Sequence, residues 1–411
     1  MGEPQSQAEN PPPSGPRRSV LFIVFATILI DFTGFSVLIP VLPLFAERLG
    51  ATPTQIGLIL TIYALAQLLF LPAWGWVSDR IGRRPVLLFS LAGTAASFAM
   101  LAAADSIGMI YAARALAGFF AASIGTAQAV VTDVTPRSER ARGMGMIGAA
   151  FGAGMIVGPV FGGVLAHFGE KLPFHAIAVL ALGNLVLAWL RLPETKARDR
   201  TPPRWGELAH SLIPAPLRLV AAVHAAHIGL FLYLFFHLFT AFAVLEGMIT
   251  YFLGKKFGAS ELEVAGIFAW IGLFLVVTQG VLLHRLDQRL GEERLVALGL
   301  VAMGVGLASV ALAPSFGWFY AIGPLIAFGN GVAFPSFTSL YSKAVSARQA
   351  GELLAQSQSM ATTGRIVGPF TAGWVMQSWS DEAPFLMAGV MMLVALVIFR
   401  IFRRTLLDGP T

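Results

Sequence analysis

The sequence contains no cysteine, and charged residues are scarce. Without cysteine, its 411 residues can form neither disulfides nor thiolate metal sites. Asp, Glu, Lys and Arg make up 12% of the chain, against about 25% in an average soluble domain. This deficit argues against a water-soluble enzyme, a disordered chain and a nucleic-acid-binding protein.

Motifs for several kinds of chemistry are also missing. The chain has no phosphate-binding loop of the Walker type, no His–Glu zinc motif and no nucleophile elbow. An ATP-driven pump and an enzyme are therefore not indicated, and we predict neither a cofactor nor a metal site.

Long apolar runs dominate the chain, and 56% of its residues are hydrophobic. A helix needs about 20 apolar residues to cross a bilayer, and lipid offers no hydrogen-bond partner to an isolated strand. We predict an all-α membrane protein with twelve transmembrane helices, near residues 19–45, 54–77, 85–104, 107–132, 142–168, 173–192, 220–253, 263–284, 294–313, 317–342, 351–378 and 383–402.

The basic residues are distributed unevenly between the loops. With the N-terminus inside, 22 of the 28 fall in cytoplasmic segments, four on the opposite side, and Arg114 and Arg365 within predicted spans. Because cytoplasmic loops are enriched in Lys and Arg, this asymmetry predicts a multi-pass protein of the cell (inner) membrane with both termini cytoplasmic. It also explains the net charge of +6 without a nucleic-acid partner.

A polar, proline-rich break divides the spans into two groups of six that repeat each other. Gly154-Met-Ile-Val-Gly158-Pro159 matches Gly364-Arg-Ile-Val-Gly368-Pro369 at an offset of 210 residues. Parallel repeats of this kind are one of the transporter architectures. The predicted domains are a disordered cytoplasmic tail (1–18), an N-terminal six-helix bundle (19–192), a cytoplasmic linker (193–218), a C-terminal six-helix bundle (219–404) and a cytoplasmic tail (405–411).

The segment Gly75-Trp-Val-Ser-Asp-Arg-Ile-Gly-Arg-Arg84 resembles the signature loop between helices 2 and 3 of the major facilitator superfamily. Asp133-Val-Thr-Pro-Arg-Ser-Glu-Arg140 and the Asp31-containing first helix are similar to tetracycline efflux proteins. The resemblance implies a cytoplasmic latch, although a solvated turn that enforces topology is the alternative. The expected latch residues are Gly75, Asp79, Arg80, Gly82, Arg83, Arg84, Asp133, Glu139 and Arg140.

Small residues at a spacing of four in the fifth span resemble the motif of drug–proton antiporters. Such residues let helices pack backbone against backbone in lipid. Packing alone and a flexing helix between the halves both fit this pattern. The helix-packing residues are Gly154, Gly158, Pro159, Gly162 and Gly163, with Gly368 and Pro369 in the second copy.

Ionisable groups within the predicted spans are the strongest candidates for function, because a charge in the bilayer usually faces a cavity. Asp31 lies near the midplane of the first span, where a carboxyl group can exchange protons, and Arg114 is a candidate ion-pair partner. His237 and Glu246 point to opposite sides of a regular helix, unless it breaks near Gly247. The predicted proton and substrate residues are Asp31, Arg114, Glu246, His237, Gln128, Arg365, Gln358, Tyr63, Gln67 and Asn330.

The resemblance implies a secondary transporter that exports amphipathic, cationic or zwitterionic compounds in exchange for protons by alternating access. A proton-coupled symporter or exchanger of a metabolite or lipid is the alternative, and a non-transporting receptor or scaffold is another. The expected partners are a small-molecule substrate, protons and the lipid bilayer, and we expect the protein to function as a monomer.

Overall fold

The computed structural model describes residues 17–136, 139–196, 226–343 and 350–407, and these contain helices but no strand. The predicted linker lies almost wholly outside the described residues. The helices of the first half are α1 (Arg17–Arg48), α2 (Pro53–Ile81), α3 (Arg83–Ala102), α4 (Ile107–Phe119), α5 (Ser123–Val134), α6 (Arg140–Phe168) and α7 (Leu172–Arg191).

The second half is built in the same way. Its elements are α10 (Ala226–Phe257), α11 (Glu261–Val277), the π-helical turn η2 (Thr278–Leu282), α12 (Leu283–Leu290), α13 (Glu292–Ala311), the short 3₁₀ turn η3 (Phe316–Trp318), α14 (Phe319–Lys343), α15 (Ala350–Ser378) and α16 (Ala383–Leu407). The last of these helices extends three residues into the segment predicted as a tail.

Eleven helical segments of the described residues are long and apolar enough to cross a membrane. The one remaining predicted span, 351–378, corresponds to α15, which has the length but not the apolar composition. Its sequence contains runs of Gln, Ser and Thr around Arg365. A helix that turns a polar face to the protein interior rather than to lipid can carry such residues. The membrane fold predicted from hydropathy is therefore correct, and the polar composition of α15 indicates an interior position.

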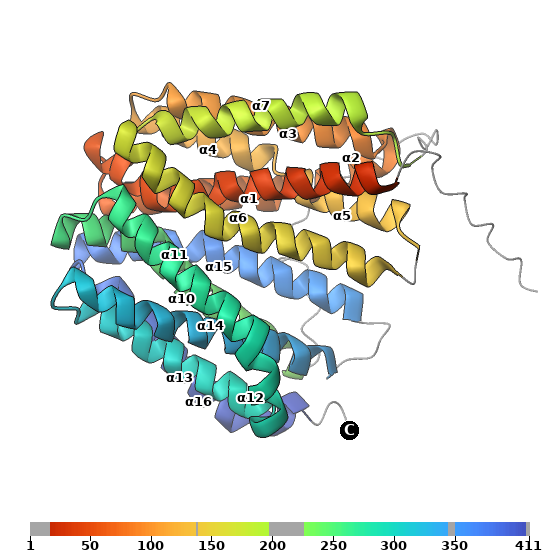
Figure 1. Ribbon diagram of the computed structural model, residues 1–411. Helices are drawn as coiled ribbons and strands as arrows, with labels where there is room; N and C mark the ends of the chain where they lie inside the picture. The colour runs from red at the N-terminus through yellow and green to blue at the C-terminus, as the bar shows by residue number, and fades with distance from the viewer. Residues whose placement is uncertain (1–16, 137–138, 197–225, 344–349, 408–411) are drawn as a thin grey trace, which may run out of the picture.

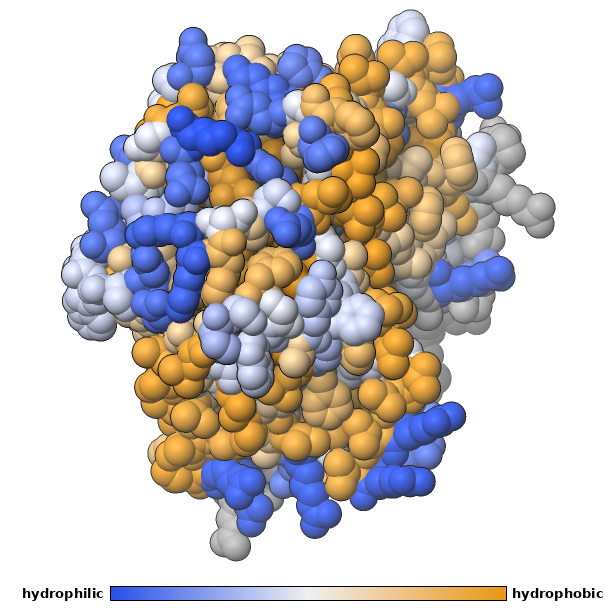
Figure 2. Space-filling view, turned by 60° about the vertical axis from the view of Figure 1, so that its left-hand side comes forward, coloured by the Kyte–Doolittle hydropathy of each residue, from blue (hydrophilic) through white to orange (hydrophobic). Residues whose placement is uncertain are grey.

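The two halves lie side by side as separate groups of helices (Figure 1). The helices α1–α7 form one group and α10–α16 the other, and the groups diverge towards the end at which α1 begins and α16 ends. Apolar residues cover much of the flank visible in Figure 2, with hydrophilic side chains gathered in separate patches. We refer below to the α1–α2 end, where the groups converge, and to the α2–α3 end, where they diverge.

The predicted span 107–132 is interrupted, because three residues in turn conformation separate α4 from α5. The break leaves the Phe119 carbonyl group without the N–H partner that a continuous helix would supply, whereas the Phe120 carbonyl accepts the Ala122 N–H at 2.7 Å. Trp74 Nε1 donates to the Phe119 carbonyl at 2.6 Å, and Ser90 Oγ donates to that of Phe120. The Trp74 side chain of α2 thus satisfies a backbone group that would otherwise be unpaired in the membrane, and Ser90 of α3 adds a second donor to the Phe120 carbonyl.

Equivalent helix pairs pack closely in the two halves. A Cβ at Gly154 or Gly158 of α6 would overlap α1 at Phe32, Thr33 and Ser36. In the second half, a Cβ at Gly364 or Gly368 of α15 would lie 2.9 Å from the Thr240 amide nitrogen or 2.7 Å from its carbonyl oxygen in α10. The repeated glycines therefore lie at corresponding helix contacts, α1 with α6 and α10 with α15.

At the α1–α2 end, contacts cross from one half to the other. The Arg48 guanidinium pairs with Glu261 at 2.5 Å, and Thr61 Oγ1 donates to the Ile366 carbonyl at 2.9 Å. Thr250 Oγ1 of α10 donates to the Ile39 carbonyl of α1 at 2.8 Å. Pro43 has no N–H to offer this carbonyl within α1, so the other half supplies its hydrogen bond.

Ion pairs within the second half brace the same end. Lys255 and Lys256 of α10 pair with Asp381 and Glu382, which precede α16, at 2.8 and 2.9 Å. The hydrogen bond from Lys256 holds the pKa of Glu382 below its usual range. These bonds tie the last turn of α10 to the start of α16, and so hold the α1–α2 end of the second half together.

Candidate functional site

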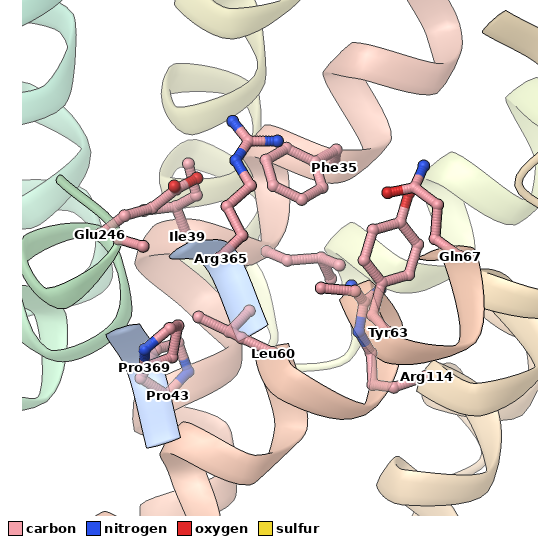
Figure 3. A pocket seen from close by; sticks show the side chains of 13 residues that line it. Phe35, Ile39, Pro43, Leu60, Tyr63, Gln67, Arg114, Glu246, Arg365 and Pro369 are labelled. Atoms are coloured by element: carbon pink, nitrogen blue, oxygen red, sulfur yellow. The ribbon is translucent and has the colours of Figure 1, made fainter. Parts of the chain in front are cut away.

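A pocket lies between the two halves and takes residues from both. Its volume is about 590 Å³, including its open mouth. The lining comes from five helices: Phe35, Leu38, Ile39 and Pro43 of α1, Leu60, Tyr63, Ala64 and Gln67 of α2, Arg114 of α4, Ala243 and Glu246 of α10, and Arg365 and Pro369 of α15. Figure 3 shows Arg365 and Glu246 on one side of the pocket and Tyr63, Gln67 and Arg114 on the other.

Arg114 is buried and faces an aromatic ring rather than an acid. It is 2% exposed, and its Nε and Nη2 atoms have no hydrogen-bond partner. The guanidinium carbon lies 4.3 Å from the centre of the Tyr63 ring. Gly118, one turn further along α4, makes this possible, because a Cβ there would overlap the Tyr63 carbonyl. The predicted ion pair between Arg114 and Asp31 is not formed among the described residues.

The contact with the Tyr63 ring does not fully offset the free-energy cost of burying the charge of Arg114. A charged side chain at the centre of a membrane helix costs at least about 2.5 kcal/mol. A desolvated cation–π contact returns about 2 kcal/mol, and two guanidinium nitrogens remain without acceptors. The balance favours a group that would accept hydrogen bonds from Arg114 inside the pocket.

Arg365 enters the pocket from the second half. Its guanidinium carbon lies 5.6 Å from the centre of the Phe35 ring, and no hydrogen bond or ion pair joins it to another described side chain. Glu246 lies within electrostatic range of Arg365, and its Oε1 atom is buried without a hydrogen-bond partner. Gly247 allows α10 to approach Pro369 of α15, since a Cβ there would be 3.0 Å from the Pro369 Cβ.

Asp31 lies behind the pocket wall and does not line it. Both carboxyl oxygens are buried and have no hydrogen-bond partner. Ser123, the first residue of α5, and the Tyr63 phenol are close enough to interact electrostatically with it. The break between α4 and α5 therefore brings the start of a helix close to a buried carboxyl group.

The remaining predicted proton and substrate residues do not join the pocket. His237 makes a 3.0 Å hydrogen bond through Nδ1 to the Tyr233 carbonyl, and α10 continues without a break through Gly247. Gln128 and Gln358 are exposed on α5 and α15, and Asn330 is half-buried on α14. No group of three His, Asp or Glu side chains within the described residues could hold a metal ion.

The predicted latch residues form a polar cluster at the α2–α3 end. Arg83 pairs with Asp79 at 2.9 Å and with Asp133 of α5 at 3.3 Å, and Lys196 pairs with Asp79 at 2.6 Å. Glu194 accepts the backbone N–H groups of Arg83 and Arg84 at 2.7 and 3.3 Å, so a carboxylate caps the N-terminus of α3. All the residues of this cluster belong to the first half of the chain.

The turn before α3 depends on glycine. Gly82 has a φ of +106° and faces the Glu194 carboxylate, where a Cβ would overlap it. Arg80 lies 4.3 Å over the Trp76 ring, and the Arg140 guanidinium donates to the Thr132 carbonyl at 3.4 Å. Gly75 faces open space, and Glu139 precedes α6. The turn therefore holds the cluster in place within the first half.

The second half has a related but different turn. Gly291 has a φ of +75°, and Glu292 follows it at the start of α13. Glu292 pairs with Lys343 of α14 at 2.8 Å and accepts a hydrogen bond from Ser339. Within the described residues at this end, ion pairs join helices of the same half only.

Sequence reasoning missed several residues of these sites. Phe35 follows Asp31 by one helical turn, and this spacing was the available signal for its position beside the pocket. Glu194 and Lys196 lie in the segment predicted as a linker, and nothing in the sequence indicated that they would fold back onto α2 and α3. Trp74 and Ser90 acquire their roles only from the break in the fourth span.

Comparisons with known proteins agree with this fold. The sequence matches the profile of the Major Facilitator Superfamily over residues 24–361, with a second match over 230–408. It is 30% identical over 390 residues to the class E tetracycline resistance protein of Escherichia coli, covering 93% of this chain and 95% of that protein.

Two solved structures share the architecture. A bacterial homologue of the human lysosomal transporter Spinster, in an inward-facing and occupied conformation, superposes with a TM-score of 0.76 at 14% identity, covering 96% of this chain and 98% of that one. The human organic anion transporter MFSD10 superposes with a TM-score of 0.67 at 24% identity, covering 94% and 100%. At these identities the similarity extends to the fold alone.

Proposed function

The chain belongs to the major facilitator superfamily, and we propose that it exports amphipathic small molecules in exchange for protons. Membership makes it a multi-pass membrane transporter rather than an enzyme. The drug-export part of the proposal draws on the similarity to the tetracycline resistance protein. Substrate and protons would use the same cavity in turn, as the two halves rock about it.

One observation carries the proposal: the pocket is shared by both halves, and the contacts that join the halves around it are concentrated at one end. Arg48 with Glu261 and Thr250 with Ile39 cross between the halves at the α1–α2 end. At the α2–α3 end, the ion pairs among the described residues remain within a half. This arrangement is suited to a transporter whose cavity opens towards the α2–α3 end, and the reverse state requires the contacts at the α1–α2 end to break.

Two buried carboxyl groups are suited to carry the proton. Asp31 has no hydrogen-bond partner on either oxygen, and Glu246 has one oxygen without a partner. A buried carboxylate without hydrogen-bond partners is costly, which suits Asp31 for binding a proton, whereas the nearby Arg365 offsets part of this cost at Glu246. Asp31 lies beside Tyr63 of the pocket wall, so its charge is felt where substrate would bind.

Topology and the latch complete the proposal. The charge asymmetry supports cytoplasmic termini in the cell (inner) membrane, so the α2–α3 end would face the cytoplasm. We propose that Asp79, Arg83 and Asp133 hold α2, α3 and α5 as one unit that meets the second half when the cytoplasmic end closes. A monomer in the lipid bilayer contains both halves of the cavity and needs no second copy.

The test uses proteoliposomes that contain a pH-sensitive dye and an imposed proton gradient. Addition of a tetracycline-like compound or another amphipathic substrate is expected to produce a proton flux opposite to the movement of substrate. Asp31→Asn cannot exchange the proton and should lose this coupling. Asp105→Asn removes a carboxylate from an exposed loop and should transport as the unchanged protein does.

The direction of the flux separates this proposal from the alternatives. Proton and substrate movement in the same direction would identify a symporter. Coupled transport that persists unchanged in Asp31→Asn would refute the assigned role of Asp31. If no amphipathic compound and no lysolipid is moved at all, the export proposal fails and a receptor or scaffold becomes the better interpretation.

A further inference from the structure

The pocket presents two guanidinium groups that lack acid partners. Arg114 reaches it from the first half and Arg365 from the second, and neither forms an ion pair with a described residue. Each lies against an aromatic ring of the lining, at Tyr63 and Phe35. Rings accept part of a cation's charge but do not satisfy the hydrogen-bond donors of a guanidinium.

The charge of the pocket is never negative. If the Glu246 carboxyl group is protonated, the lining carries two positive charges, and if it is ionised, the sum is one positive charge. Asp31 lies just behind the wall. Ionisation of Asp31 as well brings the sum of the four groups to zero, and protonation of either acid makes it positive. A cationic substrate therefore finds no net attraction here in any protonation state, whereas an anion is attracted whenever at least one of the two acids is protonated.

The aromatic rings of the pocket lining favour a flat, aromatic ligand. The centres of the Phe35 and Tyr63 rings are 6.0 Å apart, and a guanidinium group lies against each. The rest of the lining is largely aliphatic, from residues such as Leu38, Ile39 and Leu60. An aromatic ligand can contact these faces, while its anionic oxygens accept the hydrogen bonds that the arginines lack. A planar guanidinium fork matches a carboxylate particularly well.

We propose that this pocket selects planar aromatic anions, in particular carboxylates, with Arg365 and Arg114 as the residues that bind the negative group. The inference rests on the transport function proposed above, and it favours anionic substrates over the cationic or zwitterionic ones that the family resemblance implies. The two arginines come from opposite halves, so an anion held by both bridges the halves across the pocket.

The test is a binding measurement with three probes that share one ring system. The probes are 2-naphthoate, the uncharged 2-naphthamide and the 2-naphthylmethylammonium cation, each titrated into the purified full-length protein in nanodiscs. The carboxylate is expected to bind at least about tenfold more tightly than the amide, and the cation most weakly, because hydrogen bonds to a charged group are stronger than neutral ones.

Substitutions at Arg365 locate the effect. Arg365→Gln should weaken naphthoate binding about tenfold and leave naphthamide nearly unchanged, whereas Arg365→Lys should retain part of the selectivity because it keeps the charge. Arg191→Gln removes a positive charge from an exposed position on α7 and should leave all three affinities unchanged. Thermal unfolding of each variant verifies that it is folded.

The results of the binding measurement can be distinguished from those of the proton-flux measurement. Tighter binding of the ammonium probe than of naphthoate overturns the inference, as does failure of naphthoate to bind or an equal effect of Arg365→Gln on naphthoate and naphthamide. Binding is measured without a proton gradient. Loss of proton coupling with intact, Arg365-dependent naphthoate binding would therefore refute the proposed antiport and leave the anion site standing.

Discussion

Gly57 offers a way to open the α1–α2 end by adding one methyl group. This residue of α2 lies directly against α15, and a Cβ there would overlap the Pro369 carbonyl oxygen. The same Cβ would be 2.9 Å from the Pro369 carbonyl carbon and 3.3 Å from the Phe370 Cα. The atoms it meets are backbone atoms, which cannot rotate away as a side chain can. Relief therefore requires α2 and α15 to separate.

The expected size of the effect follows from measured costs of overpacking. Inserting a methyl group into a tight contact costs about 1–3 kcal/mol. The cost applies only while the two helices touch, so it should shift the equilibrium away from the closed α1–α2 end by about 5- to 150-fold. Gly183→Ala on α7 is the matched control, because nothing lies within 4 Å of the position its Cβ would take.

The assay exploits the absence of cysteine from the chain. Leu60→Cys places a single thiol in the pocket, and a membrane-impermeant maleimide is added from the side of the α1–α2 turn. Labelling should be faster by about 5- to 150-fold in the Gly57→Ala background and unchanged in the Gly183→Ala background. Equal labelling rates in both would show that the interface relaxes without opening, and the reasoning from backbone contact would be refuted.

Two further predictions concern carbonyl groups that side chains satisfy. Thr250→Val keeps the shape of the side chain but removes the donor to the Ile39 carbonyl. It should lower the free energy of unfolding by about 1–3 kcal/mol. Thermal and denaturant unfolding in detergent would measure this loss. Thr240→Val on the same helix should cost less, because Thr240 donates to a carbonyl of its own helix; equal losses would contradict this. Trp74→Phe should also destabilise by about 1–3 kcal/mol by leaving the Phe119 carbonyl unpaired, and a neutral result would mean that another donor replaces Trp74.

Part of the site could be inferred from the sequence, because a charged residue within a long apolar run is rare and indicates a position that faces the protein interior. Arg114, Arg365 and Glu246 were predicted as cavity residues for this reason, and the structure brings all three to one pocket. Asp31 and His237 were predicted by the same reasoning but do not line it. Periodicity gives the face of a helix, but the neighbour that each face meets depends on the crossing of helices distant in sequence.

The ion pair expected between Asp31 and Arg114 shows what the sequence could not predict. On one continuous fourth span, 107–132, Arg114 and Gln128 would share a single face. The chain instead breaks after α4, so the residues beyond the break follow a new helix axis. No glycine or proline marks the three residues of the break, and its stability comes from Trp74 and Ser90 on neighbouring helices.

The sequence by itself determined that this protein crosses a membrane, because too few charges and too many apolar runs leave no soluble alternative. It also determined the duplication and the glycines at which helices touch, since close contact between backbones in lipid requires small residues. Tertiary structure alone decided that Arg114 and Arg365, far apart in the chain, reach one pocket without acid partners. It also decided that Thr250 serves the carbonyl left open by Pro43. Those outcomes depend on how the two halves meet, and no local pattern in either half encodes the position of the other.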